Sequence, residues 1–560
     1  MKINNPWVGY LDRSYLQIKN SLLQRLGEKV PEVTDHSESN ILVIILSMFS
    51  GVAEMLNYYI DNMAREAFIT TARRYSSVVR HTRLIDYRIK AAIPSTTDLT
   101  LTFLGDNNEP APSLYSFNIP SGTRFYTNNN INFITTRDII VPPGIMSVTL
   151  PVEQKDYKSN MYIGLVETTN DPIFSLGDNY VNDSLNLMIN GIPWERVDTL
   201  GLSKPTDKHF IIDVSVDKLA YIRFGDNING ARPELGSELI GEYYTTQGSK
   251  GNVLNNTITN TNFDISTLSG RDFKVNNLLG STGGSDYEGI ERLKRSAPLH
   301  LRTLNRAVTP QDYVDIALLA PGVDKAKIKH SCGNNIELYI SPNYGGIATT
   351  LLLENTERYF DDKKTVGTIV EARPAGISEI VLTVNVTARF RRSIIQTRED
   401  INNALLERYS YNNSDINMKV RVSDVIAIVD NLEKVDYLDL VNIYLKPYIR
   451  PNNHHEALNG YIDILPNSTE RLKWKLQYDG AYMRLYKNMI HVSNITVGEI
   501  YNDPEGIIKV TILPSNYLTG QEWEFITEPY NVNIETEDFS VPILKPENLV
   551  INVKEQITAN

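Results

Sequence analysis

The sequence has a single cysteine, Cys332, among 560 residues. A disulfide framework and a multi-cysteine zinc site are both excluded, because each needs more than one cysteine. The chain also lacks the uninterrupted apolar run of ~18 residues that crosses a bilayer, since its longest stretch is Ile41 to Phe49. The opening MKINNPWVGYLDRS does not have the basic and then apolar order of a signal peptide. We therefore expect assembly in a reducing cytoplasm without membrane insertion.

Basic residues are in the minority, with 55 lysines and arginines against 67 aspartates and glutamates. The net charge of −12 disfavours a non-specific nucleic-acid binder, because such a protein needs a basic surface to neutralise phosphates. We therefore expect no nucleic-acid partner. A chain of this length should divide into several domains, each with its own core.

Signatures of catalysis are also scarce. Cys332 has no local base, and the adjacent His454 and His455 would point to opposite faces of a strand. Asp361 and Asp362 lie in charged sequence that is typical of a solvated surface. No Ser-His-Asp, HExxH or GxGxxG pattern stands in a supporting context. We expect no catalytic residue, no metal site and no cofactor, and therefore a protein that is not an enzyme.

Two glycine-containing loops resemble ligand sites only superficially. GSTGGSDYEG, from Gly280, lacks the Gly-Lys-Ser/Thr ending of a phosphate loop. FGDNINGARPELG carries Asp226 and Asn229, but its spacing does not fit a calcium loop and Arg232 would repel a cation. We expect a joint between structural units at the first loop and a structured β-turn at the second.

Residues 1–92 are expected to be helical. Between residues 42 and 67, apolar side chains recur at alternating steps of four and three, the repeat of a coiled coil. A second apolar stripe beside the first means that this helix needs more than one neighbour. Packing inside its own domain and packing in a bundle shared between chains both remain open. The interface candidates of the first stripe are Leu42, Leu46, Phe49, Ala53, Leu56, Ile60 and Met63, and the second stripe holds Ile41, Ile45, Met48, Val52, Met55 and Tyr59.

Positive charge gathers in two segments of this acidic chain. TARRYSSVVRHTRLIDYRIK, from Thr71, is expected to form a second, basic helix. Residues 290–304 form a basic segment with apolar residues at helical spacing. Its positive side chains make either a solvated helix face or a surface that docks onto an acidic partner, which another copy of this chain could supply. The candidates are Arg292, Lys294, Arg295, Arg302 and Arg306.

Near residue 95 the spacing of apolar residues changes from that of a helix to every second residue. Segments such as TDLTLTF and KHFIIDVSVDKLAYIRFGD predict an antiparallel β domain over residues 93–262. A linker and the basic helix are expected over residues 263–308. Thr309, Pro310 and Asp312 then have the spacing of a capped helix start.

An internal repeat organises residues 309–450. DYVDIA from Asp312 aligns with DVIAIV from Asp424 at an offset of 112 (424 − 312), and the same offset relates the Val-Asp pairs at 323 and 435. The matched order of helix, turn and extended run predicts duplicated α+β units. Residues 451–560 are expected to form a small C-terminal β domain. The predicted fold class is multidomain α+β, with an N-terminal helical bundle segment, an antiparallel β domain, duplicated α+β units and that C-terminal domain.

Four blocks of sequence resemble the baseplate J-like family, which includes inner baseplate wedge proteins of contractile phage tails and related injection-system proteins. The first runs from ESNILVIILSMFSG to TDLTLTF, and the second is IPSGTRF. The third is IRFGDNINGARPELGSELIGEYYTTQGSKGNV. The fourth combines Gly-Gly-x-Asp, Arg-Ala-Val-Thr-x-x-Asp-Tyr and Pro-Gly-Val within residues 280–328. Together the blocks cover about residues 35–450, and the segment after residue 455 has no counterpart.

The resemblance implies a structural protein of a virion tail baseplate that is assembled in the host cytoplasm. Its N-terminal helices would join a bundle with another wedge protein, and its C-terminal half would help close a ring around the central hub. Host contact would rearrange the ring and trigger sheath contraction, with residues 262–285 and 447–460 as flexible joints. The implied partners are other baseplate wedge proteins, a second copy of the chain, and the hub and sheath-initiating proteins.

Two other classes of function stay open on the residues alone. A glycan-binding or fibre-attachment module would use the β domains and should present exposed aromatic clusters, but none is evident as a motif. A tail-associated hydrolase should present paired carboxylates in a groove, and the sequence shows no such constellation.

Overall fold

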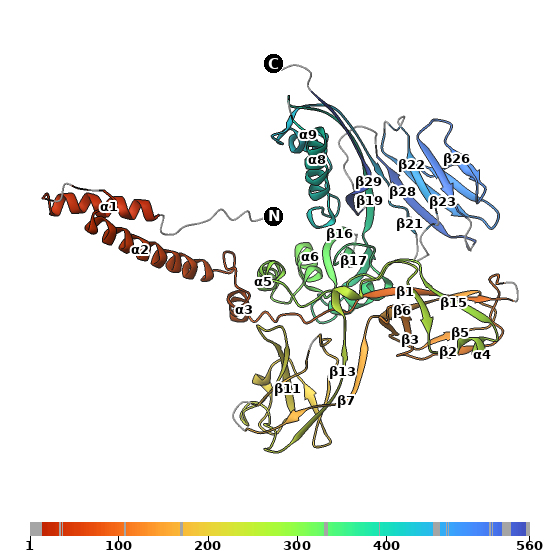
Figure 1. Cartoon of the computed structure of the whole chain (residues 1–560). Coiled ribbons are helices and arrows are strands. Elements are labelled where there is room, and N and C mark those ends of the chain that lie inside the picture. The colour runs from red at the N-terminus through yellow and green to blue at the C-terminus, as the bar shows by residue number, and fades with distance from the viewer. Residues whose placement is uncertain are drawn as a thin grey trace. The chain divides into compact units, whose positions relative to one another are not determined.

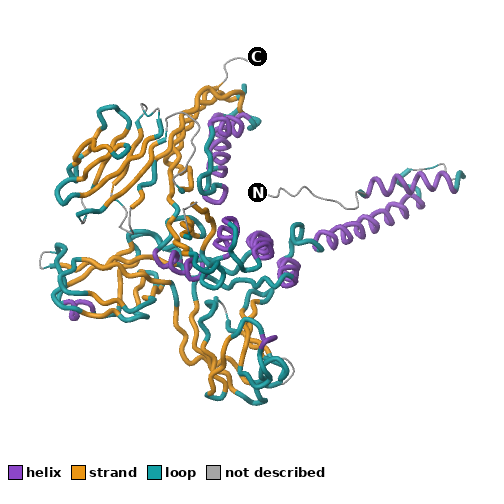
Figure 2. The backbone as a smooth tube through the Cα atoms, turned by 180° about the vertical axis from the view of Figure 1, so that it is seen from behind, coloured by secondary structure: helices purple, strands orange, loops and turns teal. Residues whose placement is uncertain are grey.

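The computed structural model describes residues 14–555, apart from 33–34, 36, 106–107, 169–171, 178, 330–333, 391, 452–457, 459, 466–467, 469, 514–516, 518 and 529–538. Cys332, His454 and His455 lie outside the described residues. The chain divides into two compact units. Unit 1 holds residues 1–92, 157–246 and 286–304, and unit 2 holds residues 93–156, 247–285 and 305–560. Both units combine helices with sheets (Figures 1 and 2), so the predicted multidomain α+β class is confirmed.

Four helices of unit 1 lie in the two sequence segments that were predicted to be helical. α2 begins where the Asn40 side chain accepts a hydrogen bond from the Leu42 amide, and it continues without Pro along a run of apolar residues at helical spacing. α5 tolerates an internal proline, Pro298, and ends with Leu304 in the left-handed region. The bounds are α1 Tyr15–Lys29, α2 Ile41–Glu66, α3 Tyr75–Leu84 and α5 Ile290–Thr303.

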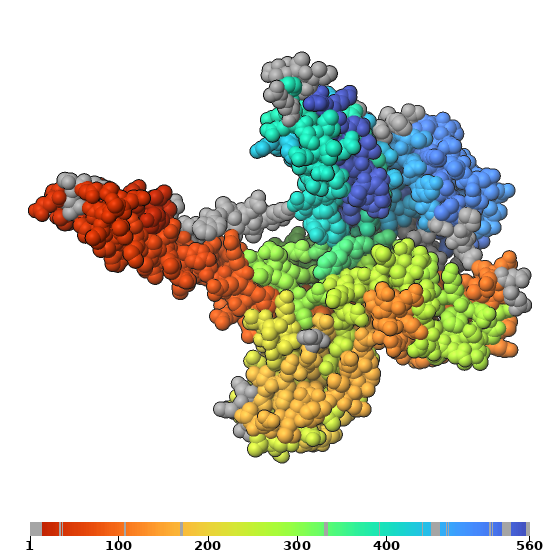
Figure 3. Space-filling model, in the orientation of Figure 1, coloured from red at the N-terminus to blue at the C-terminus, as the bar shows by residue number. Residues whose placement is uncertain are grey.

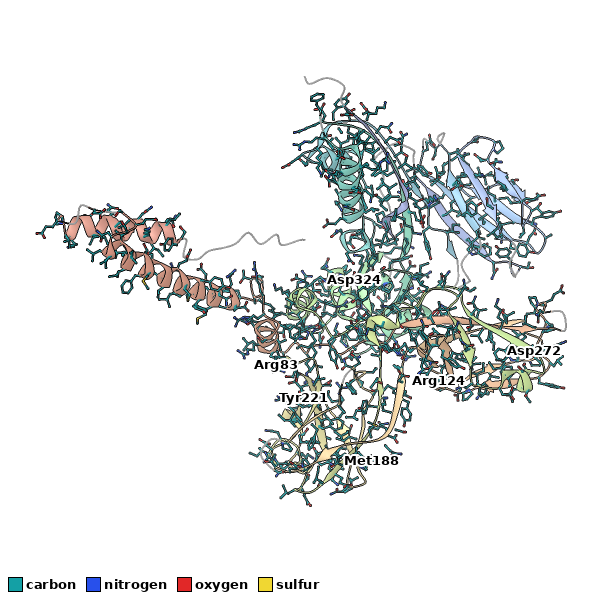
Figure 4. The ribbon with its side chains drawn as sticks, in the orientation of Figure 1. Arg83, Arg124, Met188, Tyr221, Asp272 and Asp324 are labelled. Carbon is teal, nitrogen blue, oxygen red and sulfur yellow. The ribbon has the colours of Figure 1, made fainter. Side chains whose placement is uncertain are left out.

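Unit 1 also contains a seven-stranded sheet in the order β7-β13-β9-β10-β11-β12-β8. Leu187, Ile189 and Leu239 point into its core, while Met188 (labelled in Figure 4) and Ile240 alternate with them on the exposed face. The β10–β11 pair is parallel, so this sheet is not purely antiparallel as predicted. The bounds are β7 Asp156–Leu165, β8 Ile173–Ser175, β9 Asn186–Ile189, β10 Ile192–Arg196, β11 His209–Val214, β12 Ala220–Phe224 and β13 Glu238–Thr245, with a 3-10 turn at Leu200–Leu202.

Unit 2 begins with a six-stranded sheet in the order β14-β3-β4-β6-β1-β15, accompanied by the β2–β5 pair. Its core includes Leu101, Phe103 and Phe125. The predicted β region of residues 93–262 is therefore divided between the two units. The bounds are β1 Thr96–Leu104, β2 Phe117–Ile119, β3 Arg124–Thr127, β4 Asn132–Thr135, β5 Ile139–Val141, β6 Ser147–Glu153, β14 Ile258–Thr261, α4 Ile265–Ser269 and β15 Asp272–Asn277, with a 3-10 turn at Gly248–Gly251.

The linker predicted from residue 263 onward is corrected by this sheet. The segment forms α4 and β15, and β15 pairs in an antiparallel register with β1 along residues 272–277. Its polar composition reflects an edge strand that buries only alternate side chains, such as Val275. A polar, half-buried edge strand therefore has the composition of a linker.

The glycine-rich loop at residue 280 is held by a second glycine-containing segment. The Asn252 side-chain amide donates to the Gly284 carbonyl (2.8 Å), and its oxygen accepts from the Gly284 amide (3.0 Å). A Cβ atom on Gly284 would lie 2.6 Å from the Gly248 carbonyl oxygen, so a larger residue cannot occupy this position without a backbone shift. The loop is therefore part of a tightly packed turn.

The first α+β segment of unit 2 surrounds the sheet β16-β17-β18, in which β17 is antiparallel to β16 and parallel to β18. The predicted start of α6 is confirmed, because Thr309 and Asp312 form a reciprocal capping box with Pro310 at the first helical position. Its core includes Tyr313, Ile316 and Phe360. The bounds are α6 Pro310–Leu319, β16 Val323–Lys329, β17 Asn335–Pro342, α7 Thr350–Tyr359 and β18 Ile369–Pro374.

The second α+β segment repeats this sheet pattern, since β19 is antiparallel to β20 and parallel to β29. α9 begins 112 residues after α6 (422 − 310), and β20 begins 112 residues after β16 (435 − 323), as the repeat predicts. α8 and α9 bury Ile401, Leu405, Val425 and Val429. The bounds are β19 Gly376–Ala388, α8 Ile394–Arg408, α9 Val422–Asp430, β20 Val435–Lys446 and β29 Ser540–Glu555, with a 3-10 turn at Tyr411–Asn413.

Between β20 and β29 the chain forms an additional β region around Trp474, Trp523 and Phe525. It contains the sheets β21-β28-β23-β24-β25 and β22-β27-β26. The predicted C-terminal β domain of residues 451–560 is thus an insertion, and the last strand within those bounds, β29, instead completes the sheet of the second α+β segment. The bounds are β21 Arg450–Pro451, β22 Gly460–Ile464, β23 Leu472–Tyr478, β24 Met483–Lys487, β25 Ile490–Ile495, β26 Ile500–Asn502, β27 Ile508–Ile512 and β28 Glu522–Thr527.

Candidate protein-interaction surfaces

The apolar residues of α2 are largely exposed in the isolated chain. Phe49 is 64% exposed, Leu56 57% and Met63 73%, and Leu42 and Ile60 are exposed as well. Leu46 and Ala53 are half-buried at the border of the same stripe. The second predicted stripe is also exposed. Together the exposed large apolar side chains are Ile41, Leu42, Ile44, Ile45, Met48, Phe49, Val52, Met55, Leu56, Tyr58, Tyr59, Ile60 and Met63.

These side chains cover a wide arc of the α2 surface. At about 100° per residue, the positions from Tyr58 round to Leu42 span about 200° of the helix circumference. One packed neighbour accounts for an apolar stripe of about 100°. The exposed arc of α2 therefore has room for two further helices.

The narrower, polar side of α2 is the side that α1 covers. The two helices lie side by side in Figures 1 and 2, and Figure 3 shows their surfaces adjoining in the red part of the colour scale. The Glu54 carboxylate accepts a hydrogen bond from the Tyr15 amide (3.1 Å), and Lys19 pairs with Glu38 (3.5 Å). The residues buried on α2 are Val43, Ser50, Asp61 and Arg65, and α1 has none. The hairpin thus lacks an apolar core of its own.

By length and composition alone, α2 could cross a membrane. Only 11% of its most apolar window is buried in the chain. Its partner helix α1, however, carries Lys19, Arg25, Glu28 and Lys29, and charged side chains in a bilayer core are costly. α2 itself directs Asp61 and Arg65 toward its buried side. A helical protein partner satisfies this surface better than lipid does.

The basic segments pack together as α3 and α5, and we name residues 67–92 and 286–304 the basic collar. Val78, Val79, Leu293 and Ala297 are buried where these helices lie. Arg83, labelled in Figure 4, donates from Nη2 to the Asp213 carboxylate of β11 (2.9 Å). The collar is therefore fixed to the seven-stranded sheet within unit 1.

A buried carboxylate organises the inside of the collar. The Glu288 side chain is 1% exposed and accepts hydrogen bonds from the Tyr87 hydroxyl (2.9 Å to each oxygen) and the Lys90 amide (3.4 Å). Burial and the Glu288 charge raise the pKa of Tyr87 well above its ordinary value. Burial lowers the pKa of the Lys90 ammonium to about 8; Glu288 opposes this shift, while Arg292 and Arg295 add to it.

The structure separates the five basic candidates by their surroundings. Arg292 and Lys294 are only 20% and 17% exposed, and they approach Glu288 and Glu291 at 4.0 Å. Arg295 and Arg302 lie on the exposed side of α5. Arg306 is exposed beyond the end of α5 and belongs to unit 2. Arg295 and Arg302 are among the exposed positive groups of the collar, as are Arg73, Arg74 and Arg80.

The other predicted features occupy ordinary surface positions. The Asp226 carboxylate accepts from the Ile228 and Asn229 amides (3.0 and 2.7 Å), which confirms a structured turn. Asp361 and Asp362 pair with Lys364 and Lys363 (2.9 and 2.6 Å). Among the described residues, no group of three His, Cys, Asp or Glu side chains could hold a metal ion.

One charged surface was not singled out from the sequence. Asp430, Glu433, Asp436 and Asp439 are all exposed where α9 ends and β20 begins, and we name them the acidic turn. Within the described part of the chain, Lys434 beside them pairs with Asp400 (2.7 Å) and no ion pair involves the four acids. The signal in the sequence is the run DNLEKVDYLD, which has four acids in ten residues.

Comparison with known proteins places these surfaces in a biological context. Residues 14–84 match the family model described as bacteriophage baseplate protein, N-terminal domain. The chain is 21% identical over 331 residues to the baseplate wedge protein gp6 of Enterobacteria phage T4, covering 54% of this chain and 49% of that protein. It thus spans about half the length of this curated relative.

A solved structure also resembles the chain, namely the cryo-EM structure of the anti-feeding prophage (AFP) baseplate, 6-fold symmetrised. It is 12% identical with a TM-score of 0.26, and the match covers 76% of this chain and 86% of that chain. At this TM-score the two folds are not equated. The family match covers α1, α2 and α3, and with the gp6 match it confirms the resemblance to phage baseplate proteins that the sequence motifs indicate.

Proposed function

We propose that this chain is a structural component of a virion tail baseplate, within a wedge that joins a ring around the central hub of a contractile tail. In this role it would transmit the host-contact rearrangement that triggers sheath contraction. The observation that carries the proposal is the exposed apolar arc of α2, which lies inside the segment that matches baseplate N-terminal domains. The predicted partners are other wedge proteins, a second copy of the chain, and the hub and sheath-initiating proteins.

The α2 arc supports an assembly role energetically. A fully buried large apolar side chain contributes ~1.5–3 kcal/mol, so half-burying the thirteen exposed residues would contribute on the order of 10 kcal/mol. That is comparable to the whole stability of a typical domain. An apolar surface of this extent is costly in an isolated protein, and two partner helices would remove most of it from water.

The decisive experiment places charge in the centre of the arc. We expect the double substitution Leu56→Asp and Ile60→Asp to leave a folded chain that no longer co-purifies with partner wedge proteins. Both side chains are exposed in the isolated chain, so the substitutions should not disturb its own packing. The measurement is co-expression with the other baseplate genes of the same particle, followed by affinity purification.

The matched control is Leu202→Asp with Leu235→Asp, two exposed leucines of unit 1 outside α2 and the basic collar. This control variant should retain its partners. Retention of the partners by the α2 variant would exclude the bundle, and flotation of the unaltered chain with vesicles would favour a membrane-bound α2 instead.

A further inference from the structure

A lysine, an asparagine and a glutamate meet on the three strands of the second α+β segment. Lys446 lies on β20, Glu379 on the central strand β19 and Asn548 on β29. The Asn548 carboxamide nitrogen donates a hydrogen bond to Glu379 Oε2 (3.0 Å), and Lys446 Nζ donates to Asn548 Oδ1 (3.5 Å). An amine, a carboxamide and a carboxylate are therefore in contact, although Lys446 and Asn548 lie 102 positions apart in the sequence (548 − 446).

The register of the sheet brings these side chains to one face. Glu379 and Lys446 are directly opposite each other in the antiparallel β19–β20 pair, and both are half-buried. The next residue of β19, Ile380, belongs to the core that α8 and α9 cover. Because successive side chains of a strand point to opposite faces, Glu379 and Lys446 lie on the face turned away from these helices.

A bulge in β29 supplies the asparagine. β19 and β29 pair in parallel and lie side by side in Figure 1. Between the pairs Ile380–Leu544 and Leu382–Leu549, residues 545–548 of β29 face a single residue of β19. Bulges redirect side chains and are over-represented next to active sites. This bulge ends at Asn548, which is only 8% exposed, so it holds a buried carboxamide beside Glu379.

Glu379 has the charge that a proton acceptor requires. Burial acts to raise the pKa of its carboxyl group, but hydrogen bonds from Lys545 and Asn548, together with the charges of Lys545 and Lys446, hold that pKa below its ordinary value. Glu379 is therefore a carboxylate at neutral pH. Lys545 forms an ion pair with the Oε1 atom, while Oε2 accepts from the Asn548 carboxamide.

We propose that Lys446 and Asn548 form an intramolecular isopeptide bond, with Glu379 as the catalytic residue that moves the protons. Glu379 accepts a proton from the Lys446 ammonium, and the neutral amine attacks the Asn548 carbonyl carbon, Cγ. Glu379 gives that proton to Nδ2, the Cγ–Nδ2 bond breaks, and ammonia leaves. The carboxylate takes the second proton from Nζ and passes it to the ammonia, so ammonium is released and Glu379 is regenerated.

The reaction is balanced and needs no other reagent. One C–N bond forms and one breaks, and no atom changes its oxidation state. Strand pairing holds the amine against the carboxamide, which removes much of the entropic cost of bringing two unreactive groups together. The chain has a single cysteine and cannot form a disulfide within itself, whereas an isopeptide bond requires no oxidant.

The bond ties β20 to β29 across β19 and encloses the inserted β region in a covalent loop. A cross-link that closes a long loop restricts the unfolded chain and so favours the folded one. The last strand of the sheet is then fixed permanently to the strand that precedes the insertion. This inference concerns one copy of the chain and does not rest on the proposed function.

Intact-mass spectrometry of the purified full chain, after prolonged incubation at neutral pH, tests the proposal. We expect a mass that is lower than that of the sequence by one molecule of ammonia, and a branched peptide that joins the Lys446 and Asn548 segments after proteolysis. Lys446→Arg should abolish both signals, because a guanidinium stays protonated and is not a nucleophile. Glu379→Gln should slow the reaction at least about 100-fold, since an amide cannot carry the protons. The cross-linked chain should also unfold at a higher urea concentration than the Lys446→Arg variant.

The matched control is Lys545→Arg, which changes a second lysine that contacts the Glu379 carboxylate. This variant should still lose ammonia and yield the branched peptide. An unaltered chain that keeps its full mass would overturn the proposal. Ammonia loss that persists in Lys446→Arg would also overturn it, because cyclisation of an asparagine to a succinimide releases ammonia without a lysine. If Glu379→Gln does not fold by circular dichroism, the masses of the unaltered chain and of Lys446→Arg still decide the question.

Discussion

The α1–α2 hairpin and the α8–α9 layer are both built from amphipathic helices, but they place their apolar residues in opposite directions. α8 and α9 bury Ile401, Leu405, Val425 and Val429 against the sheet of β19, β20 and β29. α2 instead directs polar residues toward α1 and leaves its apolar arc in water. The α8–α9 layer completes its core within the chain, whereas the α1–α2 hairpin leaves its apolar arc uncovered in the isolated chain. An amphipathic pattern therefore identifies a buried face without identifying the molecule that buries it.

The substitution with the largest expected effect tests whether β29 is part of the core that α8 and α9 form with the sheet of β19 and β20. Leu544→Asp places a carboxylate at a buried position of β29, next to the core of the second α+β segment. We expect a loss of about 4 kcal/mol in the free energy of unfolding, because an unpaired charge would be buried. Urea denaturation followed by circular dichroism measures the change. A loss under about 1 kcal/mol would show that the strand is peripheral to that core.

A matched pair of leucines sharpens the comparison directly. Leu405→Ala in α8 removes a fully buried side chain and should cost about 3 kcal/mol of stability. Leu56→Ala in α2 should change the stability of the isolated chain by no more than about 0.5 kcal/mol, since that side chain is exposed. Both values come from the same denaturation experiment. Equal losses would mean that α2 is already covered in the isolated chain.

The smallest expected effect concerns the buried charges of the collar. The folded-state pKa of Lys90 is about 8, against an ordinary value of 10.5, so above pH 8 the unfolded chain binds a proton that the folded chain has released. The free energy of unfolding should therefore rise with pH from about 8 to about 9.5, below the range in which tyrosines ionise. Lys90→Met should remove this rise. If the free energy of unfolding depended on pH in the same way in the unaltered chain and in the Lys90→Met variant, the Lys90 ammonium would be exposed to water.

Much of this architecture follows from local sequence patterns. The coiled-coil repeat predicts α2 because a 26-residue helix without Pro contains several successive turns with apolar residues at the same spacing. The 112-residue offset predicts the paired starts of α6 and α9, since each copy keeps its helix and strand together. The capping box at Thr309 is equally local. These features depend on residues that are close together in the sequence, so they can be predicted from one sequence alone.

The features that escaped prediction depend on partners distant in sequence. β15 has the composition of a linker because only its alternate side chains meet β1, about 170 residues earlier in the chain. β29 resembles part of the preceding β region, yet its partner β19 lies before the insertion. Arg292 and Lys294 look like a free basic face until Glu288 and Glu291 are placed beside them. The roles of the α2 and α5 interface candidates stay predictions.

The parallel pairing of β29 with β19 also has a consequence for synthesis. A ribosome releases β19, α8, α9 and β20 well before β29, and the inserted β region must emerge in between. During that interval the core around Leu382 and Val384 has an open edge, because its third strand has not yet been translated. The inserted region, with its own core, can fold first and keep the growing chain compact. Completion of the second α+β segment is thus a late event, and nascent chains that stop before residue 540 would expose an unpaired strand edge to aggregation.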